Sequence, residues 1–179
     1  EALGEFRTML AENPRLAVAQ VGAADVTLKQ GDIRAAQRSY EAAIKADPRN
    51  VDAYVGLARA HAAAGRNDEA IRNFRQALVI APADRRAMLG IADALERTGN
   101  ANAAIPFLER LAADAVADAD TWTQVGRAYL AAGRPADASA AFEEAVALGE
   151  VSEATMDGLV SAYSAEGRFG EAEIGRVHV

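Results

Sequence analysis

The chain has 179 residues and a formal net charge of −7, and 51% of its residues are hydrophobic but only 6% aromatic. This acidic balance, without any block of Lys or Arg, argues against a nucleic-acid partner, which calls for a basic stripe. The lack of cysteine excludes disulfides and thiolate chemistry. No apolar run reaches the roughly 18 residues of a membrane-spanning helix, so we expect no direct membrane insertion.

Alanine is the commonest residue, and it has the highest helix propensity of all residues. Prolines are few, and no run of alternating β-branched residues indicates strands. The composition therefore predicts an all-α protein. Arginine also far outnumbers lysine, which together with the alanine excess suggests a GC-rich bacterial genome. The compartment, bacterial periplasm or cytoplasm, stays open.

A period of 34 residues runs through the sequence. It is marked without a gap by Gly31, Gly65, Gly99, Gly133 and Gly167. Positions 4, 7, 8 and 11 of each period form one apolar helix face, and a second face follows the glycine at position 15. Each repeat is therefore predicted to be two antiparallel helices, the first ended by a left-handed glycine and the second by a proline at position 32.

In chain order, residues 1–16 match only the second helix of an incomplete repeat. The four complete repeats are 17–50, 51–84, 85–118 and 119–152, and residues 153–179 form a partial, degenerate fifth repeat. The third repeat carries Val116 in place of the closing proline, which predicts a looser junction to the fourth. One repeat buries too few side chains to offset its chain entropy, so the repeats must stack.

This pattern resembles the tetratricopeptide repeat family over essentially the whole chain. In the repeat 51–84 the residues that match the family are Tyr54, Leu57, Ala58, Gly65, Ala70, Phe74, Ala77 and Pro82. The resemblance implies a right-handed α-solenoid of antiparallel helix pairs, whose first helices line a concave groove. Chaperone-binding members of the family carry a clamp for a C-terminal carboxylate. Only Arg86 matches that clamp when it is started at the first complete repeat, so we do not expect chaperone-tail binding.

No constellation of catalytic or metal-ligating residues stands out. His61 occupies a core position and His178 lies near the C-terminus. The glycines mark helix ends rather than a phosphate-binding loop, and the acidic stretch 114–120 lacks the glycine-centred pattern of a calcium loop. We therefore expect no enzymatic activity, no cofactor and no metal.

The stripe of each first helix that lies opposite its core face is the predicted binding surface. It offers apolar residues at position 5 of the first three complete repeats, and the charges alternate at position 9. The alternation either pairs neighbouring helices or sets the register of a bound peptide. The residues predicted to line the groove are Val21, Asp25, Val55, Arg59, Arg86, Leu89, Asp93, Arg97, Thr123 and Arg127. Acids and bases nearly balance along the whole stripe, which predicts a ligand without strong charge.

Position 6 is glycine in every repeat except the fourth complete one, which has Gln124. A glycine inside a helix costs about 1 kcal/mol relative to alanine, so its recurrence indicates a need for close approach. Two explanations stay open at this point. Either neighbouring helices pack closely at this position, or a ligand backbone approaches it.

The sequence thus predicts a non-catalytic scaffold for protein–protein interaction that binds a peptide or a partner helix in the groove. One alternative is a structural spacer arm of a bacterial exopolysaccharide or cellulose export system. Another is the repeat region of a larger enzyme. Self-association through the incomplete repeat ends is also expected to be possible, because Leu3, Phe6 and Leu10 have no first helix to cover them.

Overall fold

The computed structural model describes residues 2–13, 16–114, 117–149 and 152–177, and every regular element within these ranges is an α-helix. The helices are α1 (Ala2–Glu12), α2 (Ala17–Lys29), α3 (Ile33–Ala46), α4 (Val51–Ala63), α5 (Asn67–Ile80), α6 (Arg85–Arg97), α7 (Ala101–Ala112), α8 (Ala119–Ala131), α9 (Pro135–Ala147), α10 (Glu153–Glu166) and α11 (Phe169–Val177). The predicted all-α class is confirmed. Val116, where we predict a looser junction, lies outside the described residues.

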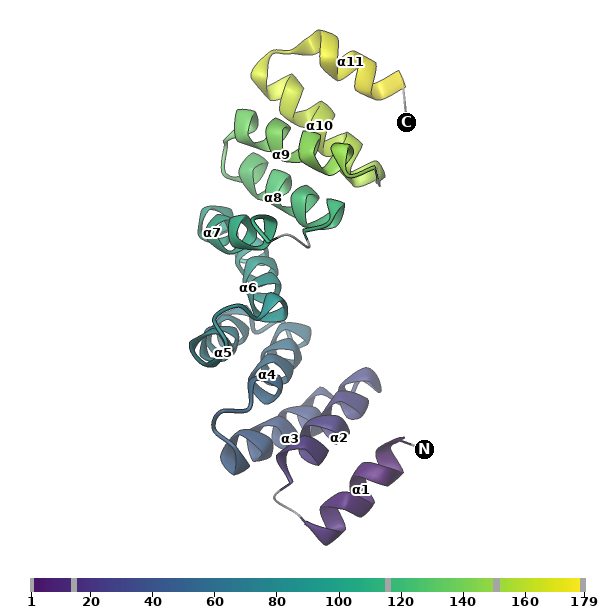
Figure 1. The fold of residues 1–179 in the computed structure, drawn as a ribbon, viewed down its shortest axis with the longest axis vertical. Helices are drawn as coiled ribbons and strands as arrows, with labels where there is room; N and C mark the ends of the chain where they lie inside the picture. Colours follow the sequence, from purple (N-terminus) through teal and green to yellow (C-terminus); the bar gives the residue numbers. More distant parts are fainter. Residues whose placement is uncertain (1, 14–15, 115–116, 150–151, 178–179) are drawn as a thin grey trace. The chain divides into compact units, whose positions relative to one another are not determined.

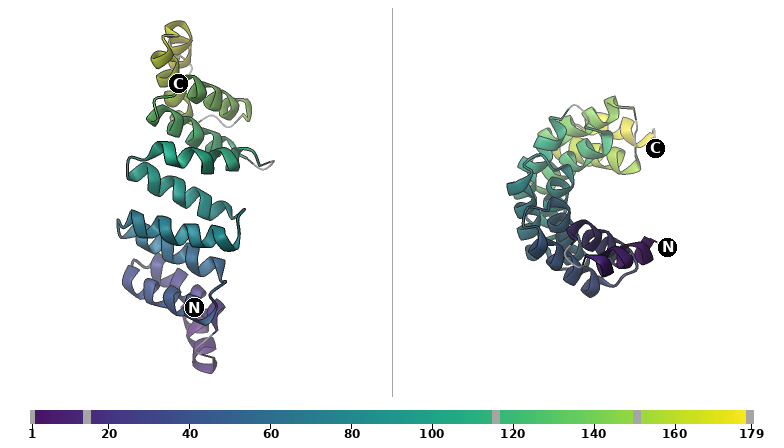
Figure 2. Two further views of the ribbon diagram at one scale, coloured as in Figure 1. Left: turned by 90° about the vertical axis from the view of Figure 1, so that its left-hand side faces the viewer. Right: turned by 60° about the horizontal axis from the view of Figure 1, so that its bottom comes forward.

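The chain divides into two compact units, Glu1–Thr98 (unit 1, α1–α6) and Gly99–Val179 (unit 2, α7–α11). In unit 1 each helix packs against the next one along the chain, and the first helices α2, α4 and α6 also pack side by side (Figure 1). Unit 2 repeats this arrangement, with α8 beside α10. Figure 2 shows the stacking of helices within each unit from two further directions. None of the helices in the described ranges is both long and apolar enough to cross a membrane.

The ends of the first helices follow the predicted period. The five glycines at position 15 have φ between +72° and +84°, the left-handed region in which only glycine is unstrained. Each turns the chain sharply after a first helix, so that the second helix runs back antiparallel to it. This part of the prediction is confirmed.

A second periodic device caps the first helices at their N-termini. The capping residues are Asn50, Asp84, Asp118 and Ser152, each immediately before its helix. Their side chains accept hydrogen bonds from first-turn backbone N–H groups at 2.8 to 3.2 Å. Such a cap contributes about 1 kcal/mol. In the sequence, these caps are marked by Asn, Asp or Ser at position 34 of each complete repeat. A prediction made from the apolar helix pattern alone overlooks this mark.

Aromatic rings at position 24 pack against the glycines at position 6 of the next repeat. A Cβ atom added to Gly56 would lie 2.2 Å from the ring of Tyr40, and one added to Gly90 would lie 2.2 Å from Phe74. The other two pairs, each at 2.3 Å, are Gly22 with Phe6 and Gly158 with Phe142. No side chain fits at such distances. Of the two explanations for these glycines, close packing between helices therefore holds.

The exception at position 6 agrees with this packing. The third complete repeat has Leu108 instead of a ring at position 24, and the next repeat has Gln124 instead of glycine. A larger residue thus occurs where the ring is missing. In the fourth complete repeat the ring of Phe142 also faces its own repeat, where a Cβ atom on Gly126 would lie 2.8 Å from it.

Replacing Gly158 with alanine is expected to lower the free energy of unfolding by about 1–3 kcal/mol, because the added methyl group displaces the ring of Phe142. Gly170→Ala is the matched control in the same unit. A Cβ atom at Gly170 meets nothing within 4 Å, so alanine is expected to be neutral or to stabilise by up to about 1 kcal/mol. Chemical denaturation followed by circular dichroism measures both changes.

The double variant Phe142→Leu/Gly158→Ala imitates the combination found at the exceptional pair. We expect it to lose less free energy of unfolding than the two single variants together, because leucine leaves room for the new methyl group. A loss equal to the sum of the single losses would contradict the packing explanation.

Candidate functional site

A cleft of about 860 Å³ opens on unit 1, and we call it the unit 1 cleft. Its volume falls within the range of known ligand sites, roughly 300–1,000 Å³. The lining residues are Asp25, Leu28, Lys29, Gly31, Ile33, Arg59, Ala62, Ala63, Phe74, Arg86, Leu89, Gly90, Asp93 and Arg97. Most of them lie in the C-terminal halves of α2, α4 and α6, which pack side by side.

The unit 1 cleft contains six of the ten residues that the sequence predicts for the groove. They are Asp25, Arg59, Arg86, Leu89, Asp93 and Arg97. Leu89 is half-buried, whereas Arg59, Asp93 and Arg97 are exposed. The structure thus brings the predicted charged residues at position 9 of three successive first helices to one surface.

Two of the predicted apolar groove residues are buried instead. Val21 is 9% exposed and Val55 only 3%. Val21 belongs to a buried cluster that includes Ala53 and Leu57 of α4. The predicted exposure of these valines is wrong, because position 5 faces the neighbouring first helix rather than solvent.

The last two predicted residues lie on α8 of unit 2. Thr123 is buried, and its hydroxyl is 2.8 Å from the hydroxyl of Thr155 on α10. This contact joins two neighbouring first helices, so Thr123 has the same packing role as the buried valines of unit 1. Arg127 is exposed.

Several lining residues are not among the predicted ones. Leu28 and Lys29 end α2, Ile33 begins α3, and Ala62 and Ala63 end α4. All except Ile33 occupy positions 12 and 13 of their repeats, at the C-terminal end of the first helix. On α2 and α4 the lining therefore lies in the C-terminal halves of the helices, whereas on α6 it extends from Arg86 to Arg97.

Asp25 is engaged by the second helix of its own repeat. The Tyr40 hydroxyl donates a hydrogen bond of 2.6 Å to Asp25 Oδ1. Burial, and then this hydrogen bond and the charge of Asp25, raise the pKa of Tyr40 well above its usual value. Asp25 therefore satisfies a buried phenol, and its carboxylate is less available to a ligand.

Arg86 is engaged in the same way. Its guanidinium lies 2.8 Å from Asp52 on α4 and 2.7 Å from Asp84, the residue that caps α6. Burial would raise the pKa of Asp84, but hydrogen bonds from Arg86 and from the Ala87 backbone N–H hold it below its usual value. Arg86 thus connects two first helices and stabilises a cap.

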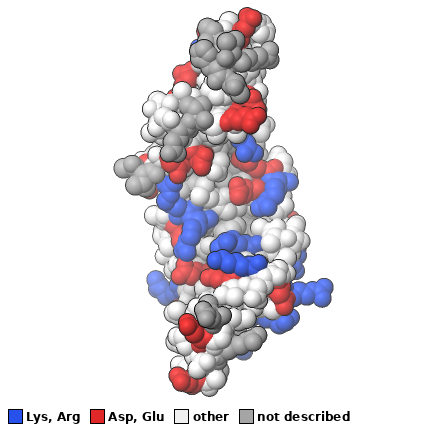
Figure 3. Space-filling view, turned by 90° about the vertical axis from the view of Figure 1, so that its right-hand side faces the viewer, with Lys and Arg blue, Asp and Glu red and all other residues white. Residues whose placement is uncertain are grey.

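Three other cations of the cleft, Lys29, Arg59 and Arg97, are exposed and form no ion pair with any residue that the structure describes. With Arg86 they make four basic residues against two acidic ones, Asp25 and Asp93. Figure 3 shows one face of the molecule, on which basic and acidic side chains are interspersed at mid-height. The near-neutral balance that we predict for the whole stripe does not hold for this cleft.

In unit 2, tyrosines at position 11 are held by a glutamate and an arginine. The Tyr129 hydroxyl donates to Glu109, and Arg134 stacks on the ring at 4.4 Å. Burial and Glu109 raise the pKa of Tyr129 to about 12. Tyr163 repeats this arrangement with Glu143 and Arg168.

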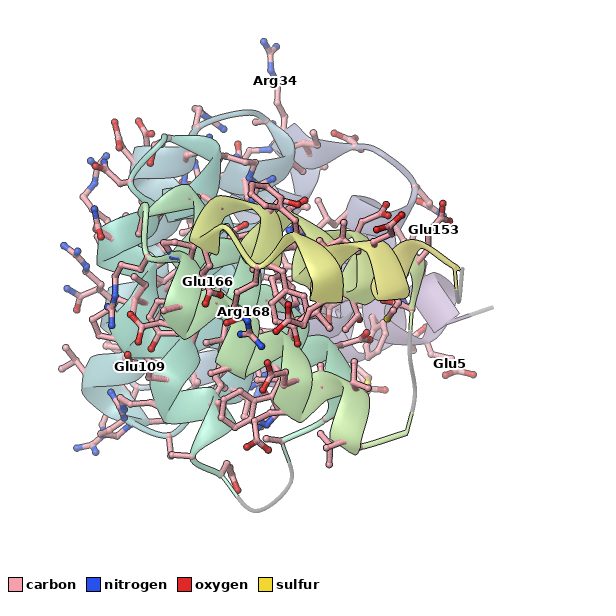
Figure 4. All side chains as sticks on the ribbon, turned by 90° about the horizontal axis from the view of Figure 1, so that it is seen from above. Glu5, Arg34, Glu109, Glu153, Glu166 and Arg168 are labelled. Carbon is pink, nitrogen blue, oxygen red and sulfur yellow. The ribbon has the colours of Figure 1, made fainter. Side chains whose placement is uncertain are left out.

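Arg168 also lies 3.6 Å from Glu166, at the end of α10 (Figure 4). The charges of this part of unit 2 are therefore tied to neighbouring side chains.

His61 stands at the same repeat position as these tyrosines. Its Nδ1 atom is buried and has no hydrogen-bond partner among the residues that the structure describes. Burial, and then the charge of Arg66, lower the pKa of His61. Within the part of the chain that the structure describes, no group of three His, Asp or Glu residues could hold a metal ion.

Two family models described as tetratricopeptide repeat match the chain, one over residues 21–84 and 125–175, the other over residues 61–128. Among solved structures, the MamA protein is 24% identical, with a TM-score of 0.81 and coverage of 89% of this chain and 87% of that one. MamA 41-end from Desulfovibrio magneticus RS-1 is 20% identical, with a TM-score of 0.83 and coverage of 90% and 92%.

YrrB, described as a TPR protein with an unusual peptide-binding site, is 18% identical, with a TM-score of 0.85 and coverage of 95% and 88%. At these identities, the likeness to MamA and YrrB shows the fold alone. No curated protein sequence gives a significant match.

Tyr40→Phe is expected to lower the free energy of unfolding at neutral pH by about 1 kcal/mol, because it removes the hydrogen bond to Asp25. The ring itself is tolerated, since Phe74 and Phe142 occupy the same repeat position. Chemical denaturation of the two proteins at matched pH measures the difference.

The difference is also expected to shrink in alkali. The pKa of Tyr40 is raised in the folded chain, so its stabilising effect is complete below the unfolded value of about 10 and is lost as the pH rises above it. The wild type should therefore lose stability more steeply than Tyr40→Phe above about pH 10. If the difference in free energy of unfolding between the two proteins stayed constant above about pH 10, the raised pKa of Tyr40 would be contradicted.

Proposed function

Because the chain belongs to the tetratricopeptide repeat family, whose members are generally non-catalytic protein-interaction scaffolds, we propose that the unit 1 cleft binds a segment of a partner protein. The bound segment lies across α2, α4 and α6. It places an apolar side chain between them and keeps its polar groups at the rim.

The observation that carries this proposal is the composition of the cleft wall. Leu28, Ile33 and Leu89 are apolar and only partly buried within the chain, so a ligand side chain can cover their remaining surface. Exposed charged residues surround them, among them Arg59 and Arg97. An apolar centre with a charged, solvated rim is the usual anatomy of a protein-recognition surface.

The structural likeness to YrrB supports the same proposal. YrrB is described as having a peptide-binding site, and its fold resembles that of this chain with a TM-score of 0.85. The likeness indicates that a stack of helices of this kind can hold a peptide. The residues proposed for binding come from the cleft of this chain and not from that comparison.

The proposal predicts that a bulky residue in the cleft abolishes binding. Ala63 is exposed at the end of α4 and lines the cleft, so Ala63→Trp should fill the space without disturbing the core. Ala46→Trp is the matched control, because Ala46 is an exposed alanine at the end of α3 outside the cleft lining. A random peptide library displayed on phage is selected on each of the three immobilised chains.

The wild type and Ala46→Trp should enrich a common set of peptides that Ala63→Trp fails to retain. Circular dichroism checks that all three chains keep the same helicity and melting temperature. Equal retention of the enriched peptides by Ala63→Trp would place binding elsewhere, and no enrichment on the wild type would overturn the proposal.

A further inference from the structure

Resting on the proposed function, we propose that the unit 1 cleft selects acidic segments, in which Asp or Glu residues flank an apolar anchor side chain. The occupant is a negatively charged stretch of another protein. More of the basic than of the acidic lining residues lack an internal partner in the described part of the chain and so stay open to a ligand.

The acidic lining residues are less available to a ligand than the basic ones. Asp25 accepts the buried Tyr40 hydroxyl at 2.6 Å and so has an internal partner. Asp93 is then the one acidic lining residue for which the structure describes no internal partner. A basic ligand segment would find a single open carboxylate in the cleft.

Among the basic lining residues, one has internal ion-pair partners and three do not. Arg86 is neutralised by Asp52 and Asp84, at 2.8 and 2.7 Å. The other three cations, Lys29, Arg59 and Arg97, form no ion pair within the described part of the chain. Each comes from a different first helix, so all three helices that line the cleft contribute a cation.

The apolar residues lie among these cations. Leu28 precedes Lys29 on α2, and Leu89 lies two helical turns before Arg97 on α6. A ligand that buries an apolar side chain against Leu28 and Leu89 therefore brings its flanking residues to the cations. Acidic flanking residues satisfy these cations, whereas basic ones are repelled.

The charge of the cleft also contrasts with that of the chain. The net charge of the whole protein is −7, yet within the described part of the chain the charged lining residues without an internal partner are three cations and one carboxylate. Cations without an internal ion-pair partner attract an acidic segment to this surface of an acidic protein. Charge complementarity thus favours both the class of ligand and the place where it binds.

The phage selection on the wild-type chain gives the first test. Peptides that depend on the cleft, as judged by their loss on Ala63→Trp, should carry more Asp and Glu than the unselected library. Cleft-dependent peptides without an acidic excess would overturn this inference and leave the proposed function standing. Failure of any peptide to depend on the cleft would overturn both.

Charge reversal gives the second test. In Arg59→Glu/Arg97→Glu, two attractions become repulsions, so an enriched acidic peptide should bind roughly tenfold more weakly or worse. The matched control is Arg38→Glu/Arg75→Glu, which makes the same change in net charge at exposed positions of α3 and α5 outside the cleft lining. Fluorescence anisotropy with the labelled peptide measures both affinities, and equal losses in the two variants would overturn the inference.

A second copy of this acidic chain is the competing occupant. Light scattering of the wild type and of Arg59→Glu/Arg97→Glu measures the oligomeric state and so shows whether the cleft binds a second copy. A monomeric wild type supports binding of a separate partner. Assembly of the wild type that the charge reversal abolishes would show that the cleft holds another copy of the chain, and would overturn the proposal.

Discussion

The contact of an aromatic ring with a helical glycine is the constraint on which the rest of this structure depends. Tyr40, Phe74 and Phe142 are at most 2% exposed, and each lies against the glycine of the next repeat where a Cβ atom would not fit. The contact fixes how closely a second helix approaches the following first helix. It also fixes the rotation of that first helix, because only one face carries the glycine.

This rotation decides which residues face a ligand. With position 6 turned toward the ring, position 5 meets the neighbouring first helix, as the burial of Val21 and Val55 shows. Leu89, at the same position of the third complete repeat, is half-buried. The open surface is left to positions 9, 12 and 13, where Arg59 and Arg97 stand.

The sequence could predict the features that repeat. Helix ends follow from the 34-residue glycine period, since a left-handed turn needs glycine wherever it occurs. The burial of Val21 could not be predicted in this way, because position 5 lies only about 40° around the helix from the open position 9. The partners of Asp25 and Arg86 could not be predicted either. Tyr40 lies 15 residues from Asp25 along the chain, and Asp52 lies 34 residues from Arg86.

Charged residues serve two different purposes in this chain. Some stabilise the fold, as Asp25 and Arg86 do in unit 1. In unit 2, Glu109 and Glu143 accept from tyrosines whose rings Arg134 and Arg168 cover, so these charges stabilise the packing of helices. In unit 1, by contrast, Arg59 and Arg97 form no ion pair within the described part of the chain, and the ring–glycine contacts join each second helix to the next first helix without them. Charges that the fold does not use can change at little cost to stability. Under the proposed function, the unit 1 cleft can therefore be adapted to a particular partner while the fold around it stays the same.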